Sequence, residues 1–376
     1  MKKIALLSAG AVMAGSLVAV GAPAEAAGSD YTCNNQTGAS AVNTLTAPAT
    51  MQAGGTAPVS LESVLTVPGT VLTGLLAPLA LLTGTGTGGA AGMITGPGGF
   101  TQAIAPKSGS LSEISPTGAT MPLSGATTFA PQVPGIYAVS PGDDNASLDT
   151  LLGTVTGVVS LNCVPVAGAP ALGTIRVLSP STTTLSLSPT TVAYGQTSRA
   201  TAKVATSLPS VPAGLGDATG TVEFSVGDKT VSGALASGET SVALPRLRAG
   251  HTYPVAALYQ PASNSLYEGS HDNASLLVVK DGTRTVVTAP NLKRRHVEVA
   301  TVKVGSTHGA TVRGTVRAVL KKGTKTLRAK TVTLRSGTAK VRFGKLRKKG
   351  TYTVVATYRA SQNFRRSVDK DALKVR

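Results

Sequence analysis

The segment Ser270-His271-Asp272 is the closest arrangement of catalytic residue types, since it places a hydroxyl, an imidazole and a carboxylate side by side. A serine hydrolase needs these groups, but it assembles them from separate segments and presents the serine on a sharp turn with its own motif. That motif is not found around Ser270. We interpret the segment as a polar turn, and the sequence predicts no catalytic residue and no enzyme activity.

Ligands for a metal ion or a phosphate are sparse. The 4 histidines have no second His or Cys at a metal-site spacing. Asp143-Asp144-Asn145 offers oxygen ligands for calcium, but further ligands in register are missing, so a plain turn is favoured. The Gly/Thr-rich residues 84–89 lack the Lys-Ser/Thr pair of a phosphate-binding loop. We therefore expect no cofactor and no metal site.

Positive charge is the one chemical feature that rises far above background. The chain has 35 Lys and Arg against 17 acidic residues, a net charge of +18. Residues 283–376 hold 25 of the basic and 3 of the acidic residues, a net +22, whereas the remainder holds 10 basic and 14 acidic residues. Such self-repulsion exceeds what solubility needs and favours a polyanionic partner. A solvated surface that merely blocks edge-strand pairing stays an alternative.

The basic side chains are expected on the outer faces of strands. Val312 and Val316 alternate with Arg313 and Arg317, so the valines should face a core and the arginines water. Lys340-Val341-Arg342-Phe343 repeats the arrangement, and the Lys-rich residues 321–325 and 345–350 are predicted to be charged hairpin tips. The candidate polyanion-binding residues are Arg313, Arg317, Lys321, Lys322, Lys325, Arg328, Lys330, Lys340, Arg342, Lys345, Arg347, Lys348 and Lys349.

The N-terminus has the parts of a secretory signal peptide. Met1-Lys2-Lys3 supplies charge, an apolar run follows, and Ala24-Glu25-Ala26 fits a cleavage site. We expect a secreted, extracellular or cell-surface protein cleaved after Ala26, with cleavage after Ala24 or a retained anchor as alternatives. Residues 64–82 are apolar but interrupted by Pro and Gly, so buried strands or a packed loop are favoured over a membrane span.

Secretion places Cys33 and Cys163 in an oxidising compartment, which predicts a disulfide. Closing so long a loop stabilises the fold by about 4–5 kcal/mol in the chain-entropy model. Two free buried thiols are the alternative.

The composition predicts an all-β chain of tandem immunoglobulin-like sandwiches after a β-rich N-terminal domain. Thr, Ser, Val, Ala and Gly dominate, and Trp is absent. The expected organisation is a signal peptide at 1–26, a β-rich domain at 27–177 with a mobile Gly/Thr-rich loop at 83–99, a sandwich at 178–281 and a basic sandwich at 282–376.

An internal repeat supports the two sandwiches. Residues 200–204 match residues 300–304, residues 247–253 match residues 346–352, and Tyr259 matches Tyr358. Tyr253 and Tyr352 begin a late strand in each copy, where such folds make a corner hydrogen bond from a tyrosine hydroxyl.

The second region, which carries the first copy of the repeat, resembles the group 3 bacterial immunoglobulin-like repeats of large surface proteins. The resemblance is carried by Thr182-Thr183-Thr184-Leu185, Val192-Ala193-Tyr194-Gly195-Gln196, Thr219-Gly220-Thr221-Val222 and Tyr267-Glu268-Gly269-Ser270. It implies a seven-stranded sandwich acting as spacer, stalk or adhesive module. The N-terminal region resembles domains of unknown function in secreted actinobacterial proteins, through Tyr31-Thr32-Cys33 and Leu161-Asn162-Cys163.

The charge and the resemblance together predict a non-enzymatic cell-surface or matrix protein. Its basic module would bind anionic envelope polymers, such as teichoic-type polymers or peptidoglycan, or other polyanions, and the remaining modules would meet a protein or carbohydrate adhesion partner. We expect no transmembrane segment in the mature chain. Two alternatives are a ligand-binding or hydrolytic N-terminal domain and an extracellular nucleic-acid binder; few aromatics accompany the basic residues for base stacking.

Overall fold

The computed structural model describes residues 26–75, 81–111, 114–115, 117–152 and 154–376, and almost all of their regular structure is β-strand, which confirms the all-β class. The predicted signal peptide lies outside the described residues except for Ala26. The chain forms two compact units. The first ends at Ser181 and also includes Thr206–Asp217 and Asn264–Glu268; the second comprises Thr182–Ala205, Ala218–Ser263 and Gly269–Arg376.

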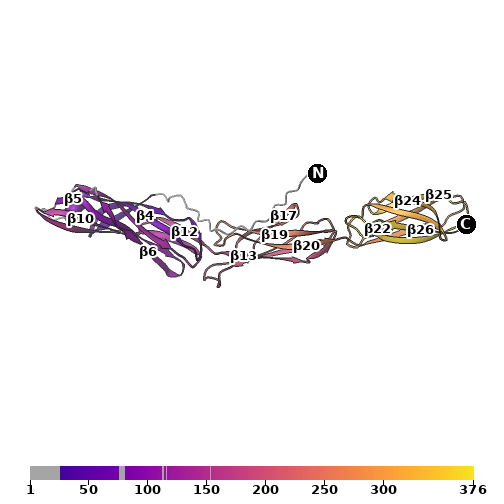
Figure 1. Ribbon diagram of the computed structural model, residues 1–376, viewed down its shortest axis with the longest axis horizontal. Helices are drawn as coiled ribbons and strands as arrows, with labels where there is room; N and C mark the ends of the chain where they lie inside the picture. The colour runs from indigo at the N-terminus through magenta and orange to yellow at the C-terminus, as the bar shows by residue number, and fades with distance from the viewer. Residues whose placement is uncertain (1–25, 76–80, 112–113, 116, 153) are drawn as a thin grey trace. The chain divides into compact units, whose positions relative to one another are not determined.

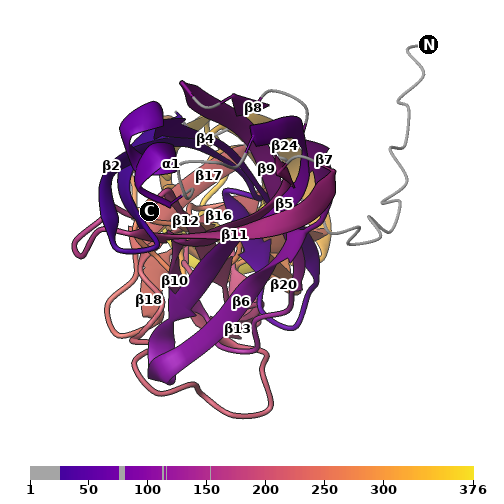
Figure 2. The ribbon, with the colours of Figure 1, turned by 90° about the vertical axis from the view of Figure 1, so that its left-hand side faces the viewer.

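One sheet of 12 strands builds the first unit. A short helix, α1 (Gly69–Leu75), lies against β2 and β4 (Figure 2), and a 3-10 turn, η1 (Pro97–Gly99), follows β5. The strands are β1 (Ala27–Cys33), β2 (Gln36–Thr46), β3 (Thr50–Gln52), β4 (Ala57–Pro68), β5 (Leu81–Gly96), β6 (Phe100–Lys107), β7 (Gly109–Leu111), β8 (Ile114–Ser115), β9 (Gly118–Phe129), β10 (Gly135–Leu152), β11 (Val155–Pro165) and β12 (Gly173–Leu178).

The long strand β10 closes this sheet on itself. It pairs with β12, β11 and β5, and the path continues from β11 through β1, β2, β4, β9 and β6 back to β5. Side chains alternate strictly between buried and exposed along β4, as a sheet with one buried face requires. The enclosed core includes Leu61, Ile94, Ile104 and Phe129.

The Gly/Thr-rich residues 83–99, predicted to be a mobile loop, are mostly strand β5, so that prediction is wrong. Their glycines serve close packing between strands. A Cβ added at Gly86 would overlap the backbone oxygen of Ser147, and one added at Gly96 would overlap the Tyr137 ring. The low-complexity composition of this segment therefore reflects positions where only glycine fits between closely packed neighbours, not a lack of regular structure.

Two polar segments predicted to be turns are also strands. Asp143-Asp144-Asn145 lies inside β10, where the register to β5 shifts. Ser270-His271-Asp272 begins β20. The disulfide prediction is confirmed: Cys33 and Cys163 are bonded directly across β1 and β11, with their Cα atoms 3.9 Å apart.

Two β-sandwiches follow, which we call the neutral module (β13–β20) and the basic module (β21–β27) (Figure 1). The neutral module packs β13-β15-β18 against β14-β20-β19-β16-β17, and the basic module pairs β21-β22-β25 with β24-β23-β26-β27. The strands are β13 (Ser181–Ser188), β14 (Thr191–Ala193), β15 (Arg199–Thr206), β16 (Gly220–Val226), β17 (Lys229–Ala234), β18 (Glu239–Ala243), β19 (His251–Pro261), β20 (Ser270–Val279), β21 (Thr283–Thr288), β22 (Val297–Ser306), β23 (Thr315–Lys322), β24 (Lys325–Thr333), β25 (Thr338–Lys345), β26 (Gly350–Tyr358) and β27 (Ser367–Val375).

The two modules share the same immunoglobulin-like strand order apart from the short β14. The exact domain boundaries proposed above stay predictions. In the part of the chain that the structure describes, we find no helix with the length and apolar character needed to cross a membrane.

Equivalent hydrogen bonds tie the first strand to the last in both modules. Thr183 Oγ1 lies 2.7 Å from Ser270 Oγ in the neutral module, and Thr285 Oγ1 lies 2.6 Å from Ser367 Oγ in the basic module. The next acid along each last strand accepts a backbone N–H from the first: Asp272 from Leu185 at 2.7 Å, and Asp369 from Val287 at 2.9 Å. Asp272 therefore bonds strand β20 to strand β13.

The predicted tyrosine corner is present in both copies. The Tyr253 hydroxyl donates to the Arg248 carbonyl at 3.0 Å, and the Tyr352 hydroxyl donates to the Lys348 carbonyl at 2.6 Å. These bonds fix the loop that enters strands β19 and β26. The sequence repeat therefore extends to individual hydrogen bonds.

Candidate functional site

The predicted alternation of basic and apolar side chains in the basic module is confirmed. Val312 and Val316 are buried, while Arg313 and Arg317 are exposed. In residues 340–343, the side chains of Val341 and Phe343 are likewise buried between the exposed Lys340 and Arg342. On β23 and β25 the strand pleat thus places the positive charges in solvent, whereas Val312 and Arg313 lie in the loop before β23.

The three acidic residues of the basic module do not face these charges. Glu298 is completely buried. Asp369 and Asp371 each accept a backbone N–H from the first strand or the residue after it, from Val287 at 2.9 Å and from Ala289 at 2.8 Å. The positive surface of this module is therefore not neutralised from within.

The ion pairs lead to the same conclusion. Within the described ranges, the one ion pair joins His308 Nδ1 to Asp281 Oδ1 at 2.7 Å. Burial alone would raise the pKa of Asp281, but hydrogen bonds from the His308 side chain and backbone outweigh it and hold the pKa below its usual value. The 25 Lys and Arg of residues 283–376 have no carboxylate partner among the described residues.

Protonation of the buried Glu298 carboxyl further reduces the negative charge of the module. Burial, and then the neighbouring Asp371 carboxylate, raises the pKa of Glu298 to about 7. Neither of its carboxyl oxygens has a hydrogen-bond partner among the described residues. Near neutral pH a large fraction of this side chain is uncharged.

One of the two predicted hairpin tips is a hairpin. Residues 321–325 join the paired strands β23 and β24, with Lys322 opposite Lys325. Residues 345–350 instead connect β25 in one sheet to β26 in the other, so the second prediction is wrong. The sequence shows that a turn is present, but the pairing partner of each flanking strand depends on the whole sandwich.

The turn 322–325 and the loop 346–349 meet at one end of the basic module, together with the loop 291–296 and the last residue. Lys322 Nζ donates to the Lys349 carbonyl at 3.0 Å. The backbone N–H of Arg295 donates to the backbone oxygen of Leu346 at 2.7 Å, and that of Arg294 to the backbone oxygen of Arg376 at 2.9 Å. We call this surface the basic end; its members are Lys293, Arg294, Arg295, Lys322, Lys325, Arg347, Lys348, Lys349 and Arg376.

Sequence reasoning missed Arg376 and the run 293–295. The run of three cations was the available sequence signal for a basic surface. Its position beside the other loops, however, depends on a β-bridge between Leu292 and Val375. That contact has no local sequence signature.

The remaining candidates lie elsewhere on the module. Arg317 and Lys321 are on β23, Lys340, Arg342 and Lys345 on β25, and Arg328 and Lys330 on the exposed strand β24, which pairs on one side with β23. The Arg328 guanidinium donates to the Phe343 carbonyl and so links β24 to β25. Lys322 is half-buried, with its ammonium 5.3 Å from the centre of the Tyr352 ring.

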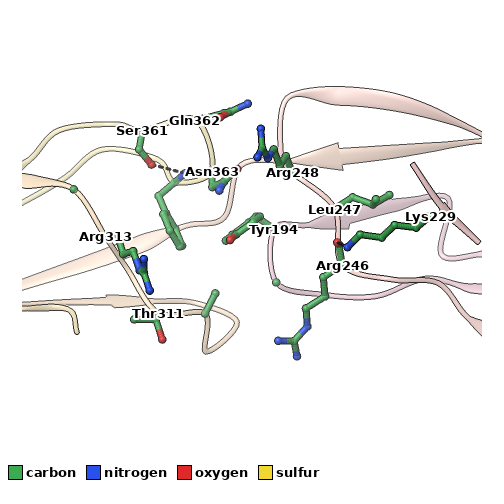
Figure 3. Close-up of a pocket in the computed structure, with 14 residues that line it drawn as sticks. Tyr194, Lys229, Arg246, Leu247, Arg248, Thr311, Arg313, Ser361, Gln362 and Asn363 are labelled. Atoms are coloured by element: carbon green, nitrogen blue, oxygen red, sulfur yellow. Dashed lines mark hydrogen bonds between the residues drawn. The ribbon is translucent and has the colours of Figure 1, made fainter. Parts of the chain in front are cut away.

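Arg313 borders a cleft of about 740 Å³ within the second compact unit (Figure 3). The neutral module contributes Lys229, Arg246 and Arg248 to it. Tyr194 and Phe364 also line it, and their ring centres are 5.2 Å apart in an edge-to-face contact. Sequence reasoning named Arg313 but missed the other three cations, since all its polyanion-binding candidates lay in the basic module.

Asp144 is a further buried carboxylate, and it lies in the first unit. It is completely buried, and the Ser63 hydroxyl donates to its Oδ2 at 2.7 Å. Burial raises the pKa of Asp144 to about 7 and, together with the nearby Asp144 carboxylate, raises the pKa of Tyr31 above its usual value. Since Asp144, Ser63 and Tyr31 are all enclosed by the sheet, we interpret them as part of the interior. Among the described residues, no group of three or more His, Cys, Asp or Glu is placed to hold a metal ion.

Comparison with known proteins yields structural likeness only. No family model matches the chain, and no curated protein matches it. Among solved structures, a tetra-tandem repeat in the extending region of a large adhesion protein is 14% identical, covers 94% of this chain and 92% of its own, and has a TM-score of 0.35.

Two further structures are less similar. Sidekick-1 immunoglobulin domains 1–5 are 11% identical, cover 87% of this chain and 56% of their own, and have a TM-score of 0.28. Trypsin-activated alpha-2-macroglobulin from Escherichia coli is 11% identical with a TM-score of 0.21 and covers 94% of this chain, which spans 24% of that protein's length. At these identities and TM-scores, neither family nor function follows from the likeness.

Proposed function

We propose that this protein is a secreted, non-enzymatic surface or matrix protein whose basic module attaches it to anionic envelope polymers, while its immunoglobulin-like modules act as spacer or adhesion units. The observation that carries the proposal is the basic end, where nine Lys and Arg side chains from separate loops gather. The three acids of the module are buried or bonded to backbone, so the positive potential of this end is available to a polyanion.

The expected mode of binding is multipoint and electrostatic. Each cation that neutralises a polymer phosphate releases a condensed counterion, so affinity falls steeply as salt rises. Lys and Arg on loops suit this role because their flexible side chains can follow a polymer without a fixed sequence. The proposal therefore predicts binding to many anionic polymers of similar charge density.

The test is co-sedimentation of the full chain with purified, teichoic-polymer-bearing cell walls at about 50 and about 500 mM NaCl. We expect retention at low salt and at least about a tenfold loss of affinity at high salt. No retention at low salt, or retention that high salt leaves unchanged, would contradict the proposal.

A charge-matched pair of variants locates the binding surface. The basic-end variant replaces four exposed cations by glutamine: Arg294, Arg347, Lys348 and Lys349. The control replaces four exposed cations of the same module that lie outside this end: Arg284, Lys303, Arg335 and Lys370. Both carry the same net charge, so a larger loss in the basic-end variant identifies this surface, and equal losses would show that only net charge matters.

A further inference from the structure

We propose that the cleft shown in Figure 3 is a second anion site, which binds a short segment of a linear chain that carries oxyanions at intervals. The inference rests on the proposed function, because the same envelope polymer would occupy it. It adds that the neutral module takes part in binding, although the excess positive charge of the sequence lies in the last quarter of the chain.

The distribution of cations in the neutral module supports this site. Residues 182–281 contain six Lys and Arg and seven acidic residues. Three of those six cations, Lys229, Arg246 and Arg248, line the cleft, and the basic module adds Arg313. The residues that line it include no Asp or Glu. A nearly neutral module thus directs half of its positive charge to one concave surface.

The spacing of the cations indicates a chain rather than a single ion. Figure 3 shows Tyr194 near the middle of the cleft, with Arg313 on one side and Lys229, Arg246 and Arg248 on the other. In this view the guanidinium groups of Arg246 and Arg248 point in opposite directions and Arg313 lies beyond Tyr194, so the cations do not converge on one point. The volume of about 740 Å³ falls within the range of ligand sites and far exceeds one phosphate. Arginine forks bind phosphate and carboxylate oxygens equally well in geometry.

The cleft is held in shape by contacts between its two sides. Tyr194 packs edge-on against Phe364, and the Ala249 backbone N–H donates to Asn363 Oδ1 at 3.2 Å. Phe364 is 4% exposed and Tyr194 is half-buried, so the cleft offers at most one partly covered ring to a nucleobase. A single-stranded nucleic acid would need such stacking. The exposed Gln362 amide at the rim suits hydroxyl groups on a polyol or sugar chain.

The internal repeat relates this site to the basic end. Arg246-Leu247-Arg248 in the neutral module is equivalent to Lys345-Leu346-Arg347 in the basic module. Both segments lead into the tyrosine corner. The same cation-Leu-Arg element therefore borders the cleft in one copy and the basic end in the other. Two contacts on one chain raise the avidity for a long polymer.

The experiment measures binding of the full chain to defined probes at about 100 mM NaCl: a glycerol phosphate oligomer of about ten repeats, its monomer, an oligogalacturonate of equal charge and a single-stranded DNA of about ten nucleotides. The cleft variant R246A/R248A/R313A is compared with R199A/K203A/K303A, which also removes two exposed cations from the neutral module and one from the basic module. All six positions are exposed, so both variants should fold.

We expect the cleft variant to bind the phosphate oligomer or the galacturonate at least about tenfold more weakly, the control to change less than about threefold, and the monomer to bind far more weakly than the oligomer. The oligomer whose affinity falls more from wild type to the cleft variant identifies the oxyanion. Equal losses in both variants, or a monomer as tight as the oligomer, would overturn the site. Tighter binding of the DNA would overturn the ligand class.

The outcome also separates this inference from the proposed function. If wild type is retained on cell walls in a salt-sensitive way but the cleft variant keeps full affinity for every oligomer, the cleft proposal alone fails. If wild type is not retained on walls, the proposed function fails, whatever the cleft variant does with the oligomers.

Discussion

The neutral and basic modules are two copies of one fold that differ strongly in net charge. Both have the tyrosine corner and the acid that bonds the first strand to the last. Yet residues 182–281 have six basic and seven acidic residues, whereas residues 283–376 have 25 and 3. Since the same hydrogen bonds hold both copies, the fold does not require the charge. The excess charge therefore needs an explanation other than the fold, and the proposed attachment to a polyanion supplies one.

The difference extends to one buried position. Ser198 and Glu298 occupy equivalent places before the matching segments 200–204 and 300–304. Ser198 is buried and its hydroxyl donates to the Pro189 carbonyl at 2.7 Å. Glu298 is buried without a hydrogen-bond partner among the described residues. The basic module thus tolerates the energetic cost of a buried carboxyl group as well as charge repulsion at its surface.

Glu298→Gln should have the largest effect on stability. The carboxyl has its ordinary pKa of 4.5 when the chain is unfolded and a pKa of about 7 when it is folded. The folded state therefore holds an extra proton between these values, and stability falls as pH rises through them. Glutamine stays neutral, so we expect a gain of about 3 kcal/mol at about pH 8 and almost none at about pH 4.

Hydrogen exchange of the β22 and β25 amides in the full chain at the two pH values measures this gain. Strands β15 and β18 of the neutral module serve as the internal control. Equal gains at both pH values would show that ionisation of Glu298 is not the cause.

Asp272→Ala and Asp369→Ala should each cost about 1–3 kcal/mol, because a backbone N–H loses its carboxylate partner. We expect a somewhat larger loss in the basic module, where the substitution also removes one of 3 negative charges. Urea-dependent hydrogen exchange of β13 and β21 reads the two modules separately. Asparagine at either position keeps an acceptor and should restore part of the loss; a loss in one module alone would break the equivalence of the copies.

Tyr253→Phe and Tyr352→Phe should each cost about 1 kcal/mol, the usual contribution of one hydrogen bond. Both hydroxyls donate to a backbone carbonyl in the preceding loop. The measurement is the change in exchange of the β19 and β26 amides. If neither variant is destabilised, the corner bond is not a shared element of stability.

Salt should act on one module and not on the other. Raising NaCl from about 0.1 to about 0.5 M screens the repulsion of the basic module and should stabilise it by a few tenths to about 1 kcal/mol, with little change in the neutral module. Exchange rates at constant pH report both modules in one sample. An equal shift in both would indicate a general salt effect rather than self-repulsion.

The sequence was sufficient for the features that repeat locally. Alternation placed Val316 inside and Arg317 outside, and the matching Tyr253 and Tyr352 identified the corner. It failed where strands from distant parts of the chain determine the outcome. The glycines of β5 were taken for a loop because the groups they pack against, such as the Ser147 carbonyl at Gly86 and the Tyr137 ring at Gly96, lie far along the chain.

The sequence did not predict how the proposed binding surfaces are assembled, for the same reason. Arg294 joins the basic end through a backbone bond to Arg376, and Arg246 meets Arg313 across a cleft that two modules build. Local patterns give the exposure of a cation, but not its neighbours. The number of cations was therefore predictable, and their grouping was not.

The central claim, that the basic end contacts a polyanion, is tested most directly by the salt dependence of binding. The affinity of the full chain for a long glycerol phosphate polymer is measured from about 50 to about 300 mM NaCl for wild type, the basic-end variant and its control. Each lost phosphate contact should reduce the slope of log affinity against log salt by up to about 0.7, the value for single-stranded nucleic acids. We predict that the basic-end variant flattens the slope by several such steps while the control keeps nearly the wild-type slope. Identical slopes for wild type and the basic-end variant would contradict the account.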